Sequence, residues 1–209
     1  MRRLILRACR ETEGGVLVET TVMMTIFFVF ILGSVDFLMA MYQWNAATKA
    51  VEIGARIAAV SDPVSSDLSS MTGLGGGLNP GDPMPAFTRV CSGATQTCSG
   101  GGTFSQAALN TIVYGRGSSL CGDAASAYTT GMCDIFSPIL PANVVITYTQ
   151  SGLGYVARPG GPVPTITVSV QNLPFQFYFL GGLMGMANIQ IPGLTTSITG
   201  EDLSSSAPP

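Results

Sequence analysis

One carboxylate, Glu19, stands at the start of a long apolar run and four residues after a Gly14-Gly15 pair. A charged side chain at the middle of a bilayer costs roughly 2.5–3.5 kcal/mol, so this carboxylate needs a partner or a place at the interface. If the chain is cut between Gly14 and Gly15, Glu19 becomes the fifth residue, and the new α-amino group lies about 6 Å from it along a helix. In a bundle of parallel helices, the amine of one chain could then neutralise Glu19 of its neighbour. We therefore predict that Glu19 is an assembly residue that also sets the axial register between neighbours.

The residues leave alternatives to this cut and to this pairing. A cut after Gly15 would make Glu19 the fourth residue of the processed chain. Without any cut, Glu19 would be an interfacial carboxylate at the cytoplasmic edge of a plain membrane anchor, where lipid head groups solvate it.

The chain contains five cysteines, of which Cys9 lies in the basic leader. The other four, Cys91, Cys98, Cys121 and Cys133, form an even set, which in an oxidising compartment indicates two disulfides. Four cysteines allow three pairings. We predict that Cys91 pairs with Cys98 and Cys121 with Cys133, because each bond closes a short loop that contains glycine or serine. A zinc site is the alternative, but both pairs lack the usual ligand spacing of two to four residues.

The absence of histidine restricts the chemistry that these 209 residues can perform. It excludes Ser-His-Asp and Cys-His nucleophile arrangements, acid–base catalysis by histidine and most catalytic zinc sites. There is one lysine, Lys49, and the net charge is −3, so no basic face is available for nucleic acid. We therefore expect no enzymatic activity, no cofactor and no bound metal. Asp62, Asp67 and Asp82 are interpreted as solvated loop acids, because they lack the pattern of a calcium loop.

The first 14 residues form a basic leader in front of the apolar run. They carry four arginines against two glutamates, a net charge of +2, which leaves −5 on the remaining 195 residues. The apolar run extends from Val16 to about Met41 and would measure about 39 Å as a helix, enough to span a hydrocarbon core of about 30 Å. This order indicates a signal anchor with its arginines in the cytoplasm and the rest of the chain outside.

The helix is expected to continue beyond the membrane to residue 62. Asp36 would lie about 25 Å beyond Glu19, near the opposite interface. Tyr42 and Trp44 follow, as in an aromatic belt. Residues spaced alternately by three and four predict an apolar seam that packs against the same molecule or against a partner; they are Phe37, Met41, Trp44, Thr48, Val51, Ala55 and Ala58. Pro63 ends the pattern.

Beyond this helix the sequence predicts a linker followed by a small α+β domain. Residues 63–86 are rich in Pro, Gly, Ser and Asp, which indicates a flexible linker or surface loop. The domain would comprise residues 87–203, with a helix over 104–116 that stops at Gly115. Alternating patterns predict the strands of an antiparallel sheet at residues 145–149, 155–157, 166–170 and 175–179. A last extended piece is expected at residues 195–199. Residues 204–209 form a polar tail.

The residues around the Gly14-Gly15 pair resemble a known family. The basic leader, the motif Gly14-Gly15-Val16-Leu17-Val18-Glu19 and the long apolar helix are similar to type IV pilin-class proteins, which a prepilin peptidase processes. More narrowly, residues 10–60, including the Ala55-Arg56 pair, resemble TadE-like proteins, which are pseudopilins or minor pilins of tight-adherence (Flp) pilus systems. Thr20 stands where such proteins usually have an aromatic residue after the glutamate.

The resemblance implies a single-pass protein of the inner membrane whose domain is periplasmic, or extracellular once it is in the pilus. It implies that a prepilin peptidase removes residues 1–14 and that residues 15–62 form the helix. The implied partners are this peptidase and other pilins or pseudopilins of the same system. The implied role is in pilus assembly, as an initiator, tip or stabilising subunit. The alternative is an uncleaved, membrane-tethered periplasmic or surface module for binding or adhesion.

Overall fold

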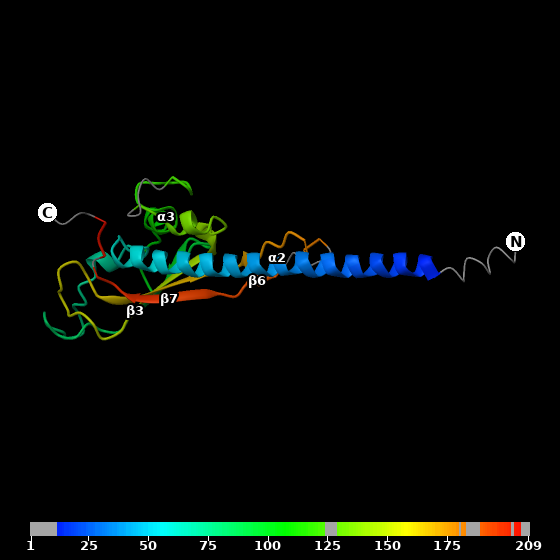
Figure 1. The fold of residues 1–209 in the computed structure, drawn as a ribbon. Coiled ribbons are helices and arrows are strands. Elements are labelled where there is room, and N and C mark those ends of the chain that lie inside the picture. The colour runs from blue at the N-terminus through cyan, green and yellow to red at the C-terminus, as the bar shows by residue number, and fades with distance from the viewer. Residues whose placement is uncertain (1–11, 124–128, 180, 183–188, 202, 206–209) are drawn as a thin grey trace. The chain divides into compact units, whose positions relative to one another are not determined.

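The computed structural model describes residues 12–123, 129–179, 181–182, 189–201 and 203–205 of the chain. Residues 1–11, which hold most of the expected leader and Cys9, lie outside the described residues. The chain forms two compact units: the helical unit, Met1–Tyr42 with Gln176–Asn188, and the sheet unit, Gln43–Phe175 with Ile189–Pro209. A long amino-terminal helix and a domain that contains a helix and an antiparallel sheet confirm the expected α+β class (Figure 1).

Helix α2 (Thr12–Ala59) continues without a break for 48 residues. It contains no proline, and it ends at Ala59, three residues earlier than expected. The N–H of Val60 donates to the carbonyl of Ile57 at 3.2 Å, which tightens the last turn. Pro63 then prevents any continuation of the helix.

Five antiparallel strands form the main sheet, in the order β2-β1-β3-β4-β7. The strands are β1 (Thr88–Ser92), β2 (Thr97–Ser99), β3 (Val144–Gln150), β4 (Pro164–Val170) and β7 (Leu194–Thr199). Strands β3 and β4 lie where the alternating pattern predicted them, and β7 lies at the expected last extended piece. In β4 every second residue is buried, which is the pattern expected when one face of a sheet covers the core. A second sheet pairs β5 (Leu173–Pro174) with β6 (Gln190–Ile191).

Short helices complete the sheet unit: α3 (Gln106–Tyr114), α4 (Met132–Ile135) and the 3-10 turns η1 (Leu68–Ser70) and η2 (Pro141–Asn143). Helix α3 confirms the predicted helix. The hydroxyl of Ser105 accepts a hydrogen bond from the N–H of Ala108 at 3.3 Å, as an N-cap does. Gly115 ends the helix at a φ of 89°, a backbone conformation that favours glycine, and a side chain there would collide with the carbonyl of Thr129.

The last part of α2, residues 43–59, packs into the core of the sheet unit. Its buried residues are mostly small: Gln43, Ala47, Ala50, Val51, Gly54, Ala55, Ala58 and Ala59. A Cβ atom added to Gly54 would overlap the side chain of Met132, which is itself fully buried. The small residues therefore allow the backbone of the helix to approach its neighbours closely.

The predicted seam is right in part. Val51, Ala55 and Ala58 are buried, so this part of the seam packs within the same chain. Phe37 and Met41 are exposed instead. The two exposed members of the predicted seam have large side chains, whereas the buried face of the helix is built mainly from small residues. Trp44 was predicted both as a residue of this seam and as part of an aromatic belt at the membrane interface. It packs against the core of the sheet unit, as the seam predicted.

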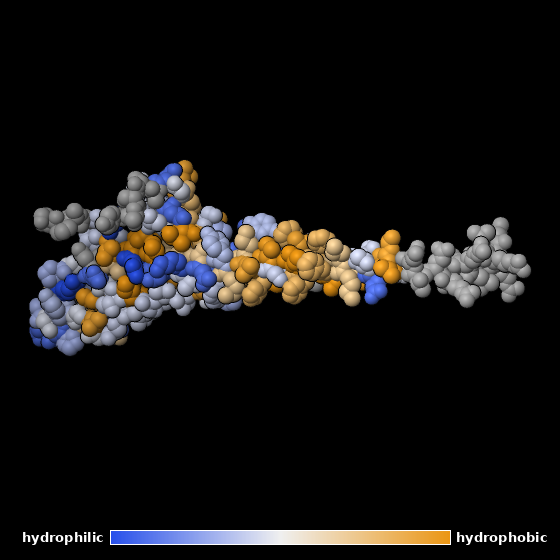
Figure 2. All heavy atoms as spheres, viewed as in Figure 1, coloured by the Kyte–Doolittle hydropathy of each residue, from blue (hydrophilic) through white to orange (hydrophobic). Residues whose placement is uncertain are grey.

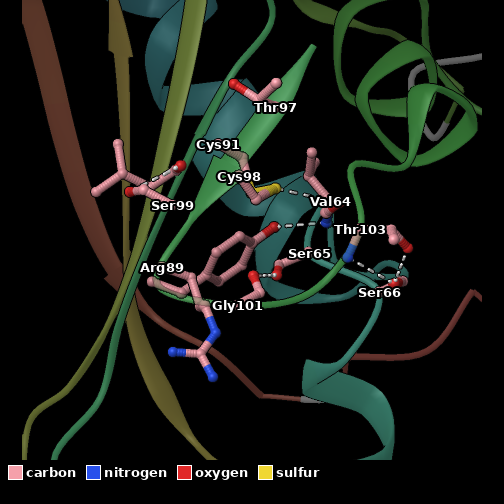
Figure 3. Close-up of a disulfide and its surroundings, with 12 residues drawn as sticks. Val64, Ser65, Ser66, Arg89, Cys91, Thr97, Cys98, Ser99, Gly101 and Thr103 are labelled. Carbon is pink, nitrogen blue, oxygen red and sulfur yellow. Dashed lines mark hydrogen bonds between the residues drawn. A yellow bond between two sulfur atoms is a disulfide. The ribbon is translucent and has the colours of Figure 1, made fainter.

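Both disulfides lie in the sheet unit and have the neighbour pairing that we expected: Cys91 with Cys98, and Cys121 with Cys133. Cys91 and Cys98 face each other across β1 and β2. Figure 3 shows this bond beside Val64. The N–H of Val64 donates to the hydroxyl of Tyr148 at 3.0 Å, and Tyr148 is completely buried.

Residues 63–86 differ from the expected linker, because their first part belongs to the core. Val64 and Leu68 are completely buried. The N–H of Ser66 donates to the carbonyl of Thr103 at 3.0 Å, and the carboxylate of Asp67 pairs with Arg89 at 3.0 Å. Composition alone does not distinguish a free linker from a loop whose backbone groups are fixed by hydrogen bonds.

Two predicted strands are wrong. At residues 155–157, Tyr155 forms only an isolated bridge with Pro83, and Ala157 has a φ of 62°, which interrupts extended structure. At residues 175–179, the N–H groups of Tyr178 and Phe179 donate to a side chain instead of to a neighbouring strand.

The carboxyl-terminal segment returns to the end of α2. The N–H of Glu201 donates to the carbonyl of Ala59 at 3.0 Å. Asp62 and Ser205 exchange two hydrogen bonds, in each of which a backbone N–H donates to the other residue's side chain at 2.9 Å. Leu203 is 3% exposed and belongs to the core. The predicted polar tail is thus held to the domain as far as Ser205.

Candidate functional site

Within the described residues, one helix is long and apolar enough to cross a membrane, and it comprises Gly15–Ala59. All its large apolar side chains between Val16 and Met41 except the half-buried Leu32 are exposed, and Figure 2 shows apolar residues covering this part of α2. An exposed apolar surface of this size is unfavourable in water and favourable in lipid. The helix therefore indicates a membrane anchor, as the sequence predicted.

Hydroxyl groups inside this span are satisfied by the helix itself. The side chains of Thr20, Thr21, Thr25 and Ser34 each donate to the carbonyl four residues earlier, at 2.8–2.9 Å. A hydroxyl that is hydrogen-bonded in this way leaves no unmade donor in the hydrocarbon. TadE-like proteins usually have an aromatic residue at the position of Thr20. Because its hydroxyl is hydrogen-bonded, Thr20 is also compatible with a position in lipid.

The predicted cleavage residues lie at the beginning of this helix. Gly14 and Gly15 fall in the first turn of α2, which starts at Thr12. Among the described residues, apart from the two chain neighbours of Gly15 and the local helix backbone, no atom lies within 4 Å of the place where a Cβ of Gly15 would be. The space around the Gly15 backbone is therefore open.

Glu19 lies one turn after Gly15 and is exposed. Within the described residues its carboxylate makes no hydrogen bond and no ion pair. The residues on either side of it, Val18 and Thr20, are also exposed. The structure thus places this carboxylate on an open, mainly apolar helix surface.

A second carboxylate of α2, Asp36, has a different environment. It is completely buried, and its two oxygens accept hydrogen bonds from the N–H groups of Tyr178 and Phe179, each at 3.0 Å. The sequence led us to expect Asp36 to lie near the interface, and it did not reveal these partners. Both donors are backbone groups from a segment more than 140 residues away.

Beyond the apolar span, the exposed face of α2 carries charge. Lys49 and Arg56 both form ion pairs with Glu52, at 2.8 and 2.6 Å. The hydrogen bond and charge of Lys49, helped by Arg56, lower the pKa of the Glu52 carboxyl. This face is typical of a helix in water, so the surroundings that α2 requires change along its length.

The other residues that could bind a metal ion take part in disulfides, hydrogen bonds or ion pairs within the chain. The four cysteines of the sheet unit are in disulfides, which leaves no thiolate for zinc. Asp62 bonds to Ser205, Asp67 pairs with Arg89, and Asp82 accepts from the N–H of Asn79. In the part of the chain that the structure describes, no three His, Cys, Asp or Glu residues converge on a possible metal site.

Comparison with known proteins identifies the segment that holds these features. Residues 14–56 match the family model described as TadE-like protein, and the match includes Gly14, Gly15, Glu19 and Asp36. No curated protein and no solved structure matches the chain. The match ends within α2, so the strands and both disulfides lie outside it. Residues 14–56 of this chain are therefore similar to a TadE-like domain, which is consistent with a TadE-like protein of the Tad pilus system.

Proposed function

We propose that this chain is a minor pilin or pseudopilin that a prepilin peptidase cleaves and that acts in pilus assembly through its amino-terminal helix. The observation that carries the proposal is the exposed carboxylate of Glu19, which makes no ion pair within the described residues. It stands at the start of a helix that is suited to lipid. A carboxylate in this position is stabilised by a positive group from another molecule.

The α-amino group of a neighbouring subunit is the partner that we propose for Glu19. Cleavage after Gly14 creates this amine at Gly15, about 6 Å along the helix from Glu19 of the same chain. When neighbouring helices are offset axially, the amine of one chain meets the carboxylate of the next. Removing one member of such a pair leaves a buried charge without compensation, at a cost of several kcal/mol. The pair thus favours one register among the possible packings.

The position of the Gly14-Gly15 pair supports cleavage. Glycine is less favourable than alanine by about 1 kcal/mol inside a helix. The two glycines lie in the first turn of α2, where few hydrogen bonds must open to expose a peptide bond. A peptidase could therefore gain access to this bond without unfolding the span.

The sheet unit supports a low-copy role. A major pilin of this system is expected to be little more than the helix, whereas this chain adds a folded unit with two disulfides. We infer that it is an initiator, tip or stabilising subunit, inserted in the inner membrane with the sheet unit in the periplasm. The disulfides favour this oxidising compartment. We also infer that it acts by assembly and not by catalysis, because the chain has no histidine.

The experiment compares Glu19→Ala with Glu52→Ala in cells that assemble the pilus. Intact mass of the membrane-bound protein reports the loss of residues 1–14, and immunoblotting of sheared filaments reports incorporation. We expect Glu19→Ala to be inserted and processed but to enter filaments at least about tenfold less, a loss equivalent to about 1.4 kcal/mol or more. Glu52→Ala removes an exposed carboxylate from the same helix and should enter filaments normally.

Two results would contradict the proposal. If the membrane-bound wild-type protein keeps residues 1–14, the chain is an uncleaved tether for a binding or adhesion module. If Glu19→Ala enters filaments as well as the wild type does, the amine–carboxylate pairing is wrong even when processing is observed.

A further inference from the structure

The segment that binds Asp36 presents aromatic side chains to its surroundings. Tyr178 and Phe179 donate their backbone N–H groups to Asp36, yet their residues are 63% and 44% exposed. They belong to the helical unit, together with the exposed apolar residues Phe37 and Leu38 of α2. The backbone of this segment is therefore directed at the helix, and its two aromatic residues remain largely uncovered.

The length of the uncharged helix places Asp36 below the membrane surface. Asp36 follows Glu19 by 17 positions, which corresponds to about 25 Å along α2. A hydrocarbon core measures about 30 Å, so the Cα atoms of the two residues cannot both lie at the head groups of an undeformed bilayer. When Glu19 stays at its own interface, Asp36 lies about 5 Å inside the opposite leaflet.

The two hydrogen bonds lower the cost of placing Asp36 and the backbone of Tyr178 and Phe179 inside the leaflet. A carboxylate without hydrogen-bond donors is costly to remove from water, and so is a backbone N–H without an acceptor. Asp36 satisfies the N–H groups of Tyr178 and Phe179, and they solvate its two oxygens. The contact therefore satisfies three polar groups at once, which are the carboxylate of Asp36 and the two N–H groups.

The composition of the segment also suits lipid. No charged residue occurs between Arg158 and Glu201, so residues 159–200 are entirely uncharged. The stretch 175–179 reads Phe-Gln-Phe-Tyr-Phe. Tyrosine and other aromatic residues favour the boundary between acyl chains and head groups. An exposed aromatic segment fixed to a membrane helix is therefore suited to this boundary.

We propose that residues 176–179 enter the leaflet opposite to Glu19 and make a second membrane contact beside α2, with Asp36 as the docking point. The partner is the phospholipid itself, at the boundary between head groups and acyl chains. The proposal rests on the membrane span of α2 but is separate from the pairing of Glu19. It gives Asp36 a role in holding a distant segment of the chain at the membrane.

The experiment places a single tryptophan at three positions of the full-length protein in phosphatidylcholine–phosphatidylglycerol vesicles. Trp44 is the only tryptophan, and Trp44→Phe supplies the background. Tyr178→Trp reports on the segment, Phe28→Trp on the span, and Tyr155→Trp on an exposed tyrosine of the sheet unit, near Arg158. Brominated phospholipids quench tryptophan within the bilayer, and aqueous iodide quenches tryptophan in water.

We expect brominated lipid to quench the Tyr178→Trp and Phe28→Trp variants to a similar extent, and several-fold more than the Tyr155→Trp variant. Phe179→Trp should repeat the result if Tyr178→Trp impairs folding. Adding Asp36→Ala should reduce lipid quenching at position 178 and increase iodide quenching there. Adding Glu52→Ala should change neither.

The other outcomes overturn the inference in ways that can be told apart. Lipid quenching at position 28 but not at position 178 leaves the span intact and refutes the second contact. Protection of position 178 from both quenchers indicates a protein partner, such as a second copy of the chain, in place of lipid. Quenching of all three positions alike shows no selective contact. Absence of lipid quenching at position 28 refutes the span and the second contact together.

Discussion

The two parts of α2 are built from opposite kinds of side chain, although they form one unbroken helix. In residues 15–42 the large side chains are exposed, and they include phenylalanine, methionine and isoleucine. In residues 43–59 the buried side chains are mainly alanine and glycine, and the exposed face carries Lys49, Glu52 and Arg56. The first part has its apolar surface on the outside, and the second part has it on the inside.

This difference shows that side-chain size follows what surrounds the helix. Lipid can adapt its packing around large, irregular side chains, so nothing favours small residues in the first part. A folded core is densely packed, and a helix that lies close to it needs small residues at the contact. Hydroxyls bond to their own helix in both parts, as Thr20 and Thr48 show. Ion pairs at the surface occur among the described residues of the second part.

The largest effect that we expect comes from removing a disulfide from the sheet unit. Cys121→Ala with Cys133→Ala opens a loop with a sequence separation of 12 and should lower the free energy of unfolding by about 3 kcal/mol. Chemical denaturation in detergent micelles, followed by the fluorescence of Trp44, measures this change. Membrane insertion of the helix should stay normal, because the described part of the helical unit holds no disulfide.

Cys9→Ala is the control for this experiment, because Cys9 lies in the leader and outside the even set of cysteines. It should leave the unfolding curve unchanged. Equal stability of the double variant and the wild type would mean that the sheet unit does not depend on this bond, and loss of membrane insertion would remove the contrast between the two units.

A smaller effect is expected from increasing side-chain size at the contact face of α2. Gly54→Val places atoms where the buried side chain of Met132 lies, and such overpacking typically costs about 1–3 kcal/mol. Unfolding of the sheet unit in micelles, again followed by Trp44, measures the cost.

Two control substitutions by valine test whether the loss of stability depends on the buried position of residue 54. Thr48→Val alters an exposed residue of the same part of α2, and Thr25→Val alters an exposed residue of the apolar span. Both should leave unfolding and insertion within about 0.5 kcal/mol of the wild type. If Gly54→Val is equally harmless, the close approach of the helix is not required.

The smallest effect concerns the ion pair between Asp67 and Arg89. Partial burial by itself raises the pKa of Asp67, but hydrogen bonds from Ser65 and Arg89 outweigh it and leave the pKa below its ordinary value. Because the folded protein holds this proton less tightly than the unfolded chain does, the pair stabilises the fold above the ordinary pKa. The stabilisation is lost as the pH falls through the lower pKa of the folded state.

Asp67→Asn should therefore lower stability at pH 7 by about 1 kcal/mol or less, and the difference from the wild type should shrink toward pH 2–3. Denaturation curves of both proteins at neutral and acidic pH test this expectation. Glu52→Gln is a suitable comparison, because Glu52 is in more exposed ion pairs and should matter less. A difference that grows at low pH would contradict the assigned direction of the pKa.

The elements that the sequence predicted are those with a strong local pattern. Helix α2 contains a long apolar run, and helix α3 and strands β3 and β4 show a clear period of apolar residues. Each of these elements lies close to its predicted range. The hairpin of β1 and β2 was missed, because it is short and rich in threonine and serine and has little apolar alternation. Its register places Cys91 opposite Cys98, so the cysteine spacing was its clearest signal.

The residues of the candidate site likewise divide into those that the sequence predicted and those that it did not. Gly14, Gly15 and Glu19 were recognisable because their residue types and spacing are unusual beside an apolar run. The environment of Asp36 was not predictable, because its partners are backbone N–H groups of Tyr178 and Phe179. Every residue except proline has such a group, so no residue type marks the partner. The one available hint was that the distance from Glu19 to Asp36 is shorter than a bilayer is thick.

The return of the carboxyl-terminal segment to the end of α2 has a consequence for biosynthesis. Asp62 and Ser205 are separated by 143 residues, so their hydrogen bonds cannot form until residue 205 has left the ribosome. The same holds for Leu203 in the core and for the cap that Glu201 provides to Ala59. A product that terminates before residue 201 would lack these contacts. The carboxyl-terminal end of its helix α2 would then be less protected from the cell's quality-control proteases.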